Sequence, residues 1–597
     1  MDVVFVNSMY FQELHTTDLG SIILKHRLDE NIESQIVNFD RLIRQGKVNL
    51  GDDNEKIFDV FAKYIVKMNP KIVVFYTVCL TYPFTIIVAK RIKQILRDVK
   101  ILFGGPQVSA SPKYNMEKFD FIDVVGVGEG EPYFNDLIKA LLLSKNLASI
   151  QSIAYRSQDS QIILNSKTKG YDFTKDYAGD YKNFDYGEEY SYFQNDHTKD
   201  IPIDIQIEAG RGCPYNCSFC STSIFWDRKC KMKSPELLIS EMNEFQEKYG
   251  FNFFSLDHDM FTANRSYIVE FCNLVIQLGV KWKWKCSSRL DCLDQDLIQL
   301  MRKANCYGIY SGVETGSQAM QIVLHKNLKI SEVLSKTRKI LEEGIDLTLS
   351  FIYGFYEETE TDFLKTLSLI EQCYILGVNT IQLHKYFPLT NTEEWDKIKD
   401  KVYLDIEKSD MSISFNMDLL SGEVAQLIQD DAETFSCFYE FDTVVRQKYS
   451  RMDHLITCFT GLFSFYARTI QYLIKKYGLQ HIYLSSENLI FESAKRFQFR
   501  NVHDSFYRKH EVEYMHDLVR NIIEGFLEKT DDRYLREISK FDENMYLYCF
   551  YGLSEPVVFS TECDVTSATE NDILTYYRIS MIDQVLDVEK LILNALN

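Results

Sequence analysis

Short, continuous apolar runs alternate with helical patterns in residues 1–145. The runs occupy residues 2–8, 35–39, 71–78, 100–106 and 121–131. Between the third and fourth runs, apolar residues recur at the spacing of a helix face. Continuous apolar strands separated by helices are typical of a parallel sheet that helices cover on both faces. The pattern therefore predicts an α/β, doubly wound, Rossmann-like domain over residues 1–145.

A second alternation of strands and amphipathic helices occupies residues 201–400. Its strand candidates lie at 204–210, 253–259, 281–289, 307–315, 346–355 and 380–388. One of the helices begins at Ser234, a favourable N-cap, with Pro235 at the first helical position. The six strand-and-helix repeats predict a partial (β/α)6 barrel of the TIM type. In such barrels the chemistry lies at the carboxyl ends of the strands.

Two further segments complete the predicted organisation. Residues 146–200 form a connector, in which 152–166 have the pattern of a hairpin and the rest is rich in Tyr and Asp. Beyond residue 400 the pattern becomes mainly helical, which predicts a mainly α-helical C-terminal domain over 401–597. No motif in that last segment carries chemistry.

Composition narrows the class of protein. Hydrophobic residues make up 46% of the chain and charged residues 25%, the balance of a folded globular protein. The formal net charge of −20 argues against a large phosphate-binding surface, so a nucleic-acid partner is disfavoured. The sequence has neither a signal-peptide pattern nor a run of about 18 apolar residues, so we expect a cytoplasmic protein without a membrane span. Its 14 cysteines are then reduced thiols.

Three of these cysteines are closely spaced directly after the first strand of the predicted barrel. Cys213, Cys217 and Cys220 lie in the stretch GCPYNCSFC. A structural zinc site needs a fourth ligand, for which Cys230 is the best candidate. Thiolates also bind iron–sulfur clusters. Three thiolates on a four-iron cluster leave one iron open, and an open iron can hold a small chelating ligand and pass it an electron.

The spacing C-x3-C-x2-C, with the aromatic Phe219 before the third cysteine, resembles the radical SAM superfamily. The resemblance implies that the open iron of a [4Fe-4S] cluster chelates the amino and carboxylate groups of S-adenosylmethionine (SAM). Residues 253–272 resemble the family's second strand with its acidic loop and helix, and residues 286–327 resemble its third and fourth strands. Residues 347–359 resemble the fifth-strand motif, although the usual PGET is YEET here.

The first domain is similar to the cobalamin-binding domain that precedes the barrel in one large branch of this superfamily. The similarity lies in FGGPQVSASP and GVGEGEPYFNDLIKAL. The cobalt-ligand motif D-x-H-x-x-G of other cobalamin proteins is absent, because His15 in ELHTTDLG has the wrong spacing to the glycine. We therefore expect His15 to be an ordinary loop residue and cobalamin to lack a histidine ligand from the protein. An empty, vestigial domain is the alternative.

Cobalamin contacts are expected at the carboxyl ends of the strands of the first domain. The candidates are Ser8, Thr77, Thr81, Tyr82, Gly104, Gly105, Pro106, Val108, Gly126, Gly128 and Glu129. Glycines in these loops allow a ligand to approach the backbone closely.

The SAM contacts follow from the charges of the ligand and the positions of the barrel strands. Arg289 is expected to bind the SAM carboxylate and Glu314 its ammonium group, unless the two form a mutual ion pair. Ser255 and Ser288 are candidates for the ribose or the carboxylate.

Other residues of the second domain have weaker assignments. Phe219 and Asp257 complete the expected SAM set. The run from Asp257 to Asp259 also suits a contact with the substrate or the cobalamin edge, or a solvated loop. Cys286 and Cys292 are expected to be core or near-core thiols.

The two implied cofactors narrow the reaction, since cofactors supply the chemistry and the protein supplies the geometry. We expect reductive cleavage of SAM to a 5'-deoxyadenosyl radical and methylation, through cobalamin, of an unactivated carbon of a natural-product or peptide substrate. An external donor, flavodoxin or ferredoxin, would supply the electron. The alternative is ring formation, rearrangement, cross-linking or epimerisation without net methyl transfer.

Two other classes of protein fit the sequence less well. The tRNA methylthiotransferases carry a second cysteine trio near the N-terminus, whereas Cys79 is the only cysteine before Cys213. A non-catalytic cobalamin or redox sensor would bind the ligands without cleaving SAM.

Overall fold

A seven-stranded sheet forms the first domain of the computed structural model, in the order β2-β1-β3-β4-β5-β6-β7. The structure describes residues 1–11, 16–49, 56–157, 159–168, 170–172, 186, 204–409, 417–498 and 508–551. The strands are β1 (Val3–Val6), β2 (Ser34–Val37), β3 (Ile72–Tyr76), β4 (Lys100–Gly104), β5 (Val124–Gly126), β6 (Ile153–Arg156) and β7 (Ile162–Leu164). The helices are α1 (Leu19–His26), α2 (Phe39–Arg44), α3 (Ile57–Lys67), α4 (Tyr82–Ile95), α5 (Pro106–Ala110), α6 (Pro112–Lys118) and α7 (Phe134–Leu142).

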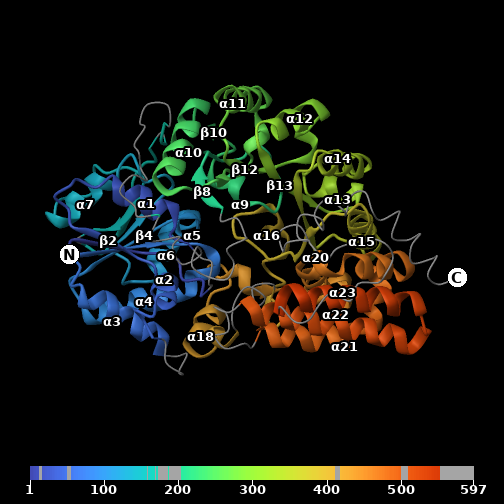
Figure 1. Ribbon diagram of the computed structural model, residues 1–597. Coiled ribbons are helices and arrows are strands. Elements are labelled where there is room, and N and C mark those ends of the chain that lie inside the picture. The colour runs from blue at the N-terminus through green and yellow to red at the C-terminus, as the bar shows by residue number, and fades with distance from the viewer. Residues whose placement is uncertain are drawn as a thin grey trace.

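Strands β1 to β5 are parallel, as their continuous apolar patterns predict, and helices lie on both faces of the sheet (Figure 1). Ligands of such doubly wound sheets bind at the carboxyl edge, where the strand order reverses between β1 and β3. The predicted hairpin forms as β6 and β7, and it extends this sheet in antiparallel fashion instead of standing in a separate connector. Residues 173–185 and 187–200 of the connector, together with His15, lie outside the described residues.

A six-stranded, fully parallel sheet forms the second domain, in the order β15-β14-β13-β12-β11-β8. Its strands are β8 (Ile205–Glu208), β11 (Phe253–Asp257), β12 (Lys283–Ser288), β13 (Cys306–Glu314), β14 (Asp346–Tyr353) and β15 (Thr380–Lys385). A short ribbon of β9 (Gly210–Arg211) and β10 (Lys231–Met232) stands at the end of β8. Its helices are α9 (Ser221–Phe225), α10 (Pro235–Tyr249), α11 (Arg265–Leu278), α12 (Gln295–Lys303), α13 (Gln318–Val323), α14 (Ile330–Glu342), α15 (Glu360–Ile375) and α16 (Glu393–Ile398).

Helix α10 begins as its sequence predicts. The Ser234 side chain accepts a hydrogen bond from the N–H of Leu237, Pro235 opens the helix, and Gly250 ends it in the left-handed region at φ 74°. The six parallel strands with their helices confirm the predicted partial barrel, and the cap of α10 confirms the predicted start of that helix.

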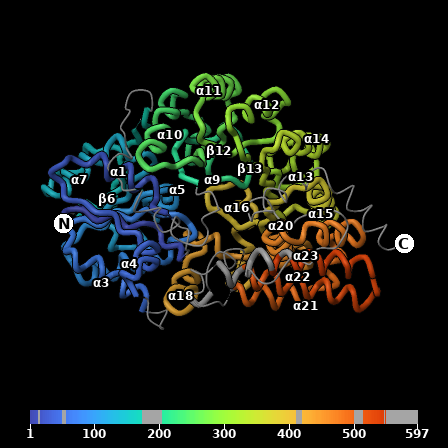
Figure 2. Tube along the Cα trace, in the orientation of Figure 1, coloured from blue at the N-terminus to red at the C-terminus, as the bar shows by residue number. Residues whose placement is uncertain are grey.

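The remaining described segment divides between the two domains (Figure 2). Its elements are β16 (Tyr403–Leu404), α18 (Gly422–Gln429), β17 (Tyr439–Glu440), α19 (Val444–Lys448), α20 (Met452–Tyr477), α21 (Leu479–Gln498), α22 (Arg508–Thr530) and α23 (Arg533–Tyr551). Residues 419–439 contribute to the core of the first domain, where the rings of Tyr82 and Phe435 lie 5.9 Å apart. Helices α20 to α23 instead share one continuous core with the barrel. No described helix is both long and apolar enough to cross a membrane.

Helix α20 covers β15, the edge strand of the partial barrel. The hydroxyl of Thr460 donates to the carbonyl oxygen of Ile381 at 2.7 Å and accepts from the N–H of the same residue at 3.2 Å. An uncovered edge strand presents unpaired backbone groups, and one side chain of α20 satisfies two of them here.

We expect Thr460→Val to lower the midpoint of thermal unfolding by a few degrees, because it leaves both backbone groups of Ile381 buried without a partner. Thr460→Ser retains the hydroxyl and is the matched control. Differential scanning calorimetry measures both variants. Equal midpoints for Val and Ser would show that the hydrogen bonds contribute nothing to the docking of α20.

Candidate functional site

The three predicted cluster ligands lie in the loop between β9 and α9, residues 212–220, which we call the cluster loop. Cys213, Cys217 and Cys220 are each half-buried, and the N–H of Cys220 donates to the carbonyl oxygen of Cys217 at 3.2 Å. Between them, the hydroxyl of Ser218 donates to Oε1 of the buried Glu394 at 2.7 Å. The loop is thereby tied to α16, so the cysteines are held by contacts outside the loop itself.

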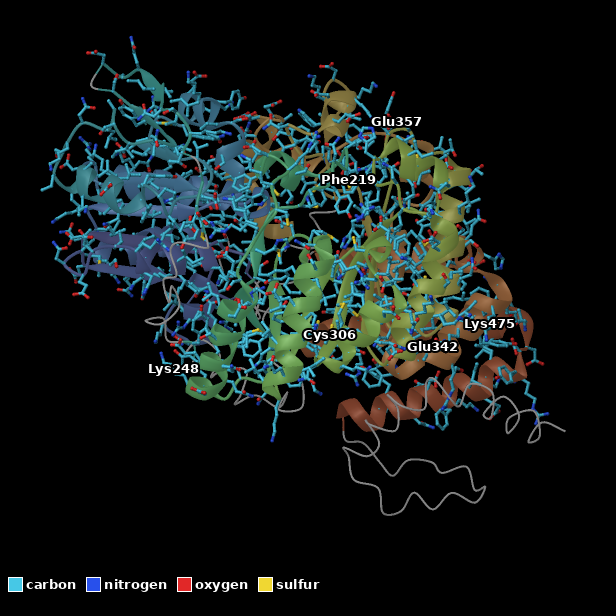
Figure 3. The ribbon with its side chains drawn as sticks, turned by 90° about the horizontal axis from the view of Figure 1, so that it is seen from above. Phe219, Lys248, Cys306, Glu342, Glu357 and Lys475 are labelled. Atoms are coloured by element: carbon cyan, nitrogen blue, oxygen red, sulfur yellow. The ribbon has the colours of Figure 1, made fainter. Side chains whose placement is uncertain are left out.

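Two aromatic rings fix the same loop against the barrel. The ring of Phe219, which Figure 3 labels, belongs to this loop. It packs on the ring of Phe355, just beyond the end of β14, with centroids 5.7 Å apart. The ring of Tyr215 lies under the guanidinium of Arg289, 3.9 Å from centroid to Cζ. Of the predicted SAM residues, Phe219 therefore forms part of the cluster loop and Arg289 contacts it.

Positive charge stands close to the cysteines. Burial raises the pKa of the Cys213 and Cys217 thiols, that of Cys217 to about 11. Lys326 and Arg289 oppose this rise at Cys217, because their charges favour the thiolate. The thiolate is the form that binds a metal, and metal binding releases the proton. The residues present thus fit a site that must hold negatively charged sulfur.

A zinc site with Cys230 as fourth ligand does not fit the geometry. Sγ of Cys230 lies 3.7 Å from Nε2 of His258. Among the described residues, no three His, Cys, Asp or Glu side chains converge closely enough to hold one metal ion. A four-iron cluster bonds each thiolate to a different iron atom, so its ligands need not converge on one point.

Arg289 directly follows β12 and is 5% exposed. Its Nη2 donates to Oδ2 of Asp291 at 2.8 Å and to the carbonyl oxygen of Lys326 at 2.7 Å. Its Nη1 is buried and has no hydrogen-bond partner among the described residues. Leaving a buried charged donor unsatisfied costs free energy, so this nitrogen suits a carboxylate ligand.

Glu314 ends β13 in a strained conformation. Its φ is 68°, in the left-handed region that non-glycine residues rarely adopt, and the register of β13 shifts at this point. Its Oε1 accepts from Nζ of Lys326 at 2.8 Å, and a Cβ on Gly312 would stand 2.2 Å from that oxygen. Arg289 and Glu314 do not pair with each other. Each has a partner of its own, which excludes the alternative of a mutual ion pair.

The predicted serines separate onto two faces of the barrel. Ser255 is half-buried and shares with Asp257 the face of β11 that is turned toward the lumen, as the alternating burial of the strand indicates. Ser288 is buried on the outer face of β12, where its hydroxyl lies 2.7 Å from that of Thr262. Cys286 is buried on that outer face too, as predicted, and Cys292 is half-buried with its Sγ 3.1 Å from the Tyr215 hydroxyl.

A cavity of about 390 Å³ lies where the two domains meet. The predicted residues that line it are Gly104, Gly105, Pro106, Gly126, Gly128 and Glu129, all at strand ends of the first sheet. From the barrel it is lined by residues that directly follow the cluster loop, Ser221 and Thr222, and by Asp257 at the end of β11. The carboxyl ends of both sheets therefore open onto one space.

The cavity continues into an apolar slot between the first sheet and its helices. Phe5, Val74, Leu102, Phe134 and Leu137 line the slot. The glycines at the strand ends allow a flat ring to approach the backbone, and the slot suits an apolar part of the same ligand. The residues present therefore fit a large cofactor such as cobalamin. The other predicted cobalamin residues are fully buried and are not among those that line the cavity: Ser8, Thr77, Thr81, Tyr82 and Val108.

Gly105 shows why this edge needs glycine. Its φ is 106°, and a Cβ there would stand 2.6 Å from the carbonyl oxygen of Thr77. The Thr77 hydroxyl in turn donates to the carbonyl oxygen of Gly104 at 2.8 Å, which holds β3 and β4 together at the cavity. Thr77 therefore holds the backbone of Gly104 and Gly105 in position at the cavity.

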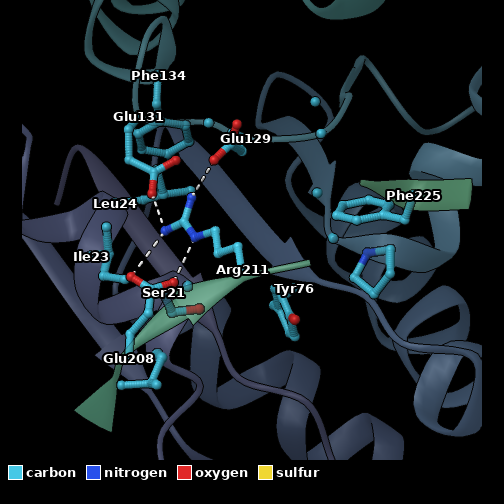
Figure 4. A pocket seen from close by; sticks show the side chains of 18 of the residues that line it. Ser21, Ile23, Leu24, Tyr76, Glu129, Glu131, Phe134, Glu208, Arg211 and Phe225 are labelled. Carbon is cyan, nitrogen blue, oxygen red and sulfur yellow. Dashed lines mark hydrogen bonds and ion pairs between the residues drawn. The ribbon is translucent and has the colours of Figure 1, made fainter. Parts of the chain in front are cut away.

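An ion-pair cluster joins the two domains across the cavity (Figure 4). Arg211 contacts Glu208 of its own domain, Nε to Oε1 at 2.6 Å. Its other nitrogens contact the first domain, at Glu129 Oε1 (3.0 Å) and Glu131 Oε1 (2.5 Å). Nζ of Lys231 adds a contact to Glu129 Oε2 at 2.6 Å. Burial would raise the pKa of Glu131, but the charge of Arg211 outweighs burial and lowers it.

Asp257 and His258 have shifted pKa values on the same side of the cavity. Enclosure by protein, with the charges of Glu208 and Asp259, raises the pKa of Asp257 to about 6. Burial lowers the pKa of His258 to about 4, and its Nδ1 accepts from the N–H of Met260 at 2.7 Å. His258 is therefore neutral, and the exposed Asp257 presents a carboxyl group to the cavity.

Family comparisons match both domains. The model of the radical SAM superfamily matches residues 207–370, and the model of the B12 binding domain matches residues 35–138. The chain therefore combines a radical SAM domain with a B12-binding domain. Its cofactors are accordingly a [4Fe-4S] cluster, SAM and cobalamin.

Relatives of this radical SAM enzyme differ in the reaction that their names state. An uncharacterized methyltransferase of Pyrococcus horikoshii is 26% identical over 57% of the chain and 72% of that protein. An anaerobic magnesium-protoporphyrin IX monomethyl ester cyclase of Rubrivivax gelatinosus is 24% identical over 53% of the chain, which spans about half (56%) of that relative. The cobalamin-dependent SAM radical enzyme OxsB, solved with aqua-cobalamin and SAM, shares the fold over 98% of the chain and 84% of its own length (TM-score 0.54, 14% identity).

Two residues of the radical SAM enzyme's site were not singled out from the sequence. Arg211 lies between Gly210 and Gly212, and Gly212 directly precedes the first cysteine. Lys326 follows Glu314 by a helix and a turn, and nothing in the local pattern predicts that it returns to that carboxylate. Arg211 pairs across the domains with Glu129 and Glu131, 82 and 80 residues away, and Lys326 pairs with Glu314, 12 residues away.

We expect Gly104→Ala and Gly105→Ala to have different effects. A Cβ on Gly104 meets no atom within 4 Å, so the variant should unfold at the wild-type temperature yet retain less cobalamin, because its methyl group occupies the cavity wall. Gly105→Ala should unfold several degrees lower, because of the clash with Thr77. Calorimetry and the visible absorbance of cobalamin retained on gel filtration measure the two effects. Full cobalamin retention by Gly104→Ala would place the cofactor away from this edge.

We expect Arg289→Gln to weaken SAM binding by about tenfold or more while the cluster stays intact, because the charge facing the ligand carboxylate is lost. Iron content and the change that SAM causes in the electron paramagnetic resonance spectrum of the reduced cluster measure the two properties. The exposed Arg265, which pairs with Asp294 on the outer helices, gives the control variant Arg265→Gln. SAM binding that is equal in both variants would remove Arg289 from the site.

Proposed function

We propose that this enzyme methylates an unactivated carbon of a natural-product or peptide substrate. The observation that carries the proposal is the shared cavity, which glycine-rich strand ends of the first domain and residues next to the cluster loop line together. When bound, the cluster with SAM would supply a hydrogen-abstracting radical, and cobalamin would supply the methyl group. Both cofactors then face one substrate, which the transfer of a methyl group to carbon requires.

The residues of the chain bind and orient the reactants in this proposal. Arg289 binds the SAM carboxylate through its unsatisfied Nη1, and Glu314, already beside Lys326, accepts from the SAM ammonium. The ion pairs of Arg211 hold the two domains together on either side of the cavity. The electron comes from an external donor protein of the flavodoxin or ferredoxin type.

Radical rearrangement or ring formation without net methyl transfer is the second candidate. The similarity to proteins named as cyclases favours it. The two candidates use the same SAM-binding residues and differ in whether the cobalamin side of the cavity supplies a methyl group.

The two candidates predict different products from anaerobic protein reconstituted with iron, sulfide, cobalamin and SAM under dithionite. Methyl transfer predicts both 5'-deoxyadenosine and S-adenosylhomocysteine, the latter in step with methylation of the reduced cobalamin. Mass spectrometry measures both nucleosides, and absorbance follows the cobalamin. Deoxyadenosine alone would favour the second candidate.

Cysteine variants control this measurement. Cys217→Ala should lose the cluster and deoxyadenosine formation, whereas Cys230→Ala, whose thiol lies against His258, should keep both. A wild-type protein that forms neither nucleoside with its correct substrate supplied would contradict both candidates.

A further inference from the structure

A basic surface turn lies directly after α9. The turn, residues 226–229, is closed by hydrogen bonds from the N–H of Arg228 to the carbonyl oxygen of Ser223 at 2.8 Å and from the N–H of Lys229 to that of Trp226 at 3.0 Å. Asp227 and Arg228 have φ values of 52° and 54°. Two consecutive non-glycine residues in the left-handed region are strained, and such strain persists where the surrounding structure imposes it.

The turn is packed against the cluster loop. Gly212 immediately precedes Cys213, and a Cβ on Gly212 would stand 2.0 Å from the carbonyl oxygen of Lys229. Glycine thus allows the backbone of the basic turn to lie on the backbone of the loop that holds the cluster. The side chains of Arg228 and Lys229 are exposed, so they carry positive charge at the surface close to the cluster position.

A groove beside the turn extends the basic surface. Its volume is about 390 Å³, and it adjoins the cavity between the domains, with which it shares Gly128, Glu129 and Arg211. Its lining also includes Lys167, Lys229, Trp226 and Ile224, the last 49% exposed. Asp227 lies 3.7 Å from Nζ of Lys229 and offsets part of the charge. The surface thus has an apolar centre with cations around it.

This surface contrasts with the chain as a whole, whose formal net charge is −20. An acidic protein approaching the enzyme is repelled by the average surface and attracted where cations gather. Complementary charge steers association and fixes orientation more than it adds affinity. A basic surface on an acidic enzyme therefore selects where an acidic partner docks.

We propose that the basic turn with Lys167 and Ile224 is the docking surface for an acidic, one-electron donor protein. The inference rests on the proposed function, because a radical SAM enzyme needs an external reductant. One electron leaves the reduced donor, which is oxidised, and enters the cluster, which is reduced. No bond forms or breaks in this step. The short path from the turn to Gly212 and Cys213 is the reason for docking here and not elsewhere.

The test compares two reductants on the full-length, reconstituted enzyme. Reduced flavodoxin, an acidic protein, requires docking, whereas dithionite reaches the cluster without a protein surface. We expect the double variant Arg228→Glu with Lys229→Glu to form deoxyadenosine about tenfold more slowly with flavodoxin at low salt, and at the wild-type rate with dithionite. Raising the salt concentration should slow the wild type with flavodoxin and leave the variant nearly unchanged.

Two variants serve as controls. Arg338→Glu with Lys339→Glu makes the same charge change on the exposed face of α14 and should retain the wild-type rate with either reductant. Arg228→Gln with Lys229→Gln removes the charges without reversing them and should give an intermediate loss with flavodoxin. Iron content confirms that each variant holds its cluster.

Other outcomes overturn the docking surface. An equal loss with both reductants would show that the turn maintains the cluster loop or admits an anionic substrate, and no loss with either would show that the donor docks elsewhere. A wild type that forms deoxyadenosine with neither reductant would contradict the proposed function itself, a result distinct from failure of the docking surface.

Discussion

The docking of the two domains depends on the buried guanidinium of Arg211. Its three carboxylate partners come from both sides, Glu208 from the barrel and Glu129 and Glu131 from the first sheet. A buried charge without partners costs several kcal/mol, so these groups are satisfied together only when the domains meet in one orientation. That orientation makes the carboxyl ends of two parallel sheets face each other, and the shared cavity is the space left between them.

At the cluster loop, too, buried charges of opposite sign lie close together. Three cysteines that must become thiolates lie near two buried cations, Lys326 and Arg289. Lys326 is neutralised by Glu314, whereas Arg289 keeps one donor unsatisfied. The site is thus pre-organised with negative sulfur, balancing positive charge and one open donor, which is the arrangement that a zwitterionic ligand requires. The strain at Glu314 is tolerated because the adjacent Gly312 leaves room for its carboxylate.

In its described residues, the segment after residue 400 packs into the cores of the two domains. Its first part packs into the core of the first domain, and α20 to α23 continue the core of the barrel. Arg446 shows how closely it is joined, because its Nη1 donates to the carbonyl oxygens of Gly354 and Tyr386, just beyond the ends of β14 and β15. Loops at the catalytic end of the barrel are therefore held in place by a part of the chain in which no motif was visible.

The sequence by itself determined the two sheets, their parallel strands and the cysteine loop. Apolar periodicity reports which local segments are buried, and residues such as Ser234 and Pro235 mark helix ends through local hydrogen bonding. It also placed Gly104 and Gly128 at the cavity, because glycine at a strand end signals close approach to the backbone.

Only the tertiary structure decided which charges meet. Glu129 was predicted as a cobalamin contact, but its carboxylate binds Arg211 and Lys231 of the other domain. Ser288 was placed at the SAM site, but its position in the pleat turns it to the outer face of β12. Local sequence patterns indicate how side chains are spaced along one helix or strand. These pairings depend instead on how distant elements pack, which is decided only when the whole chain is folded.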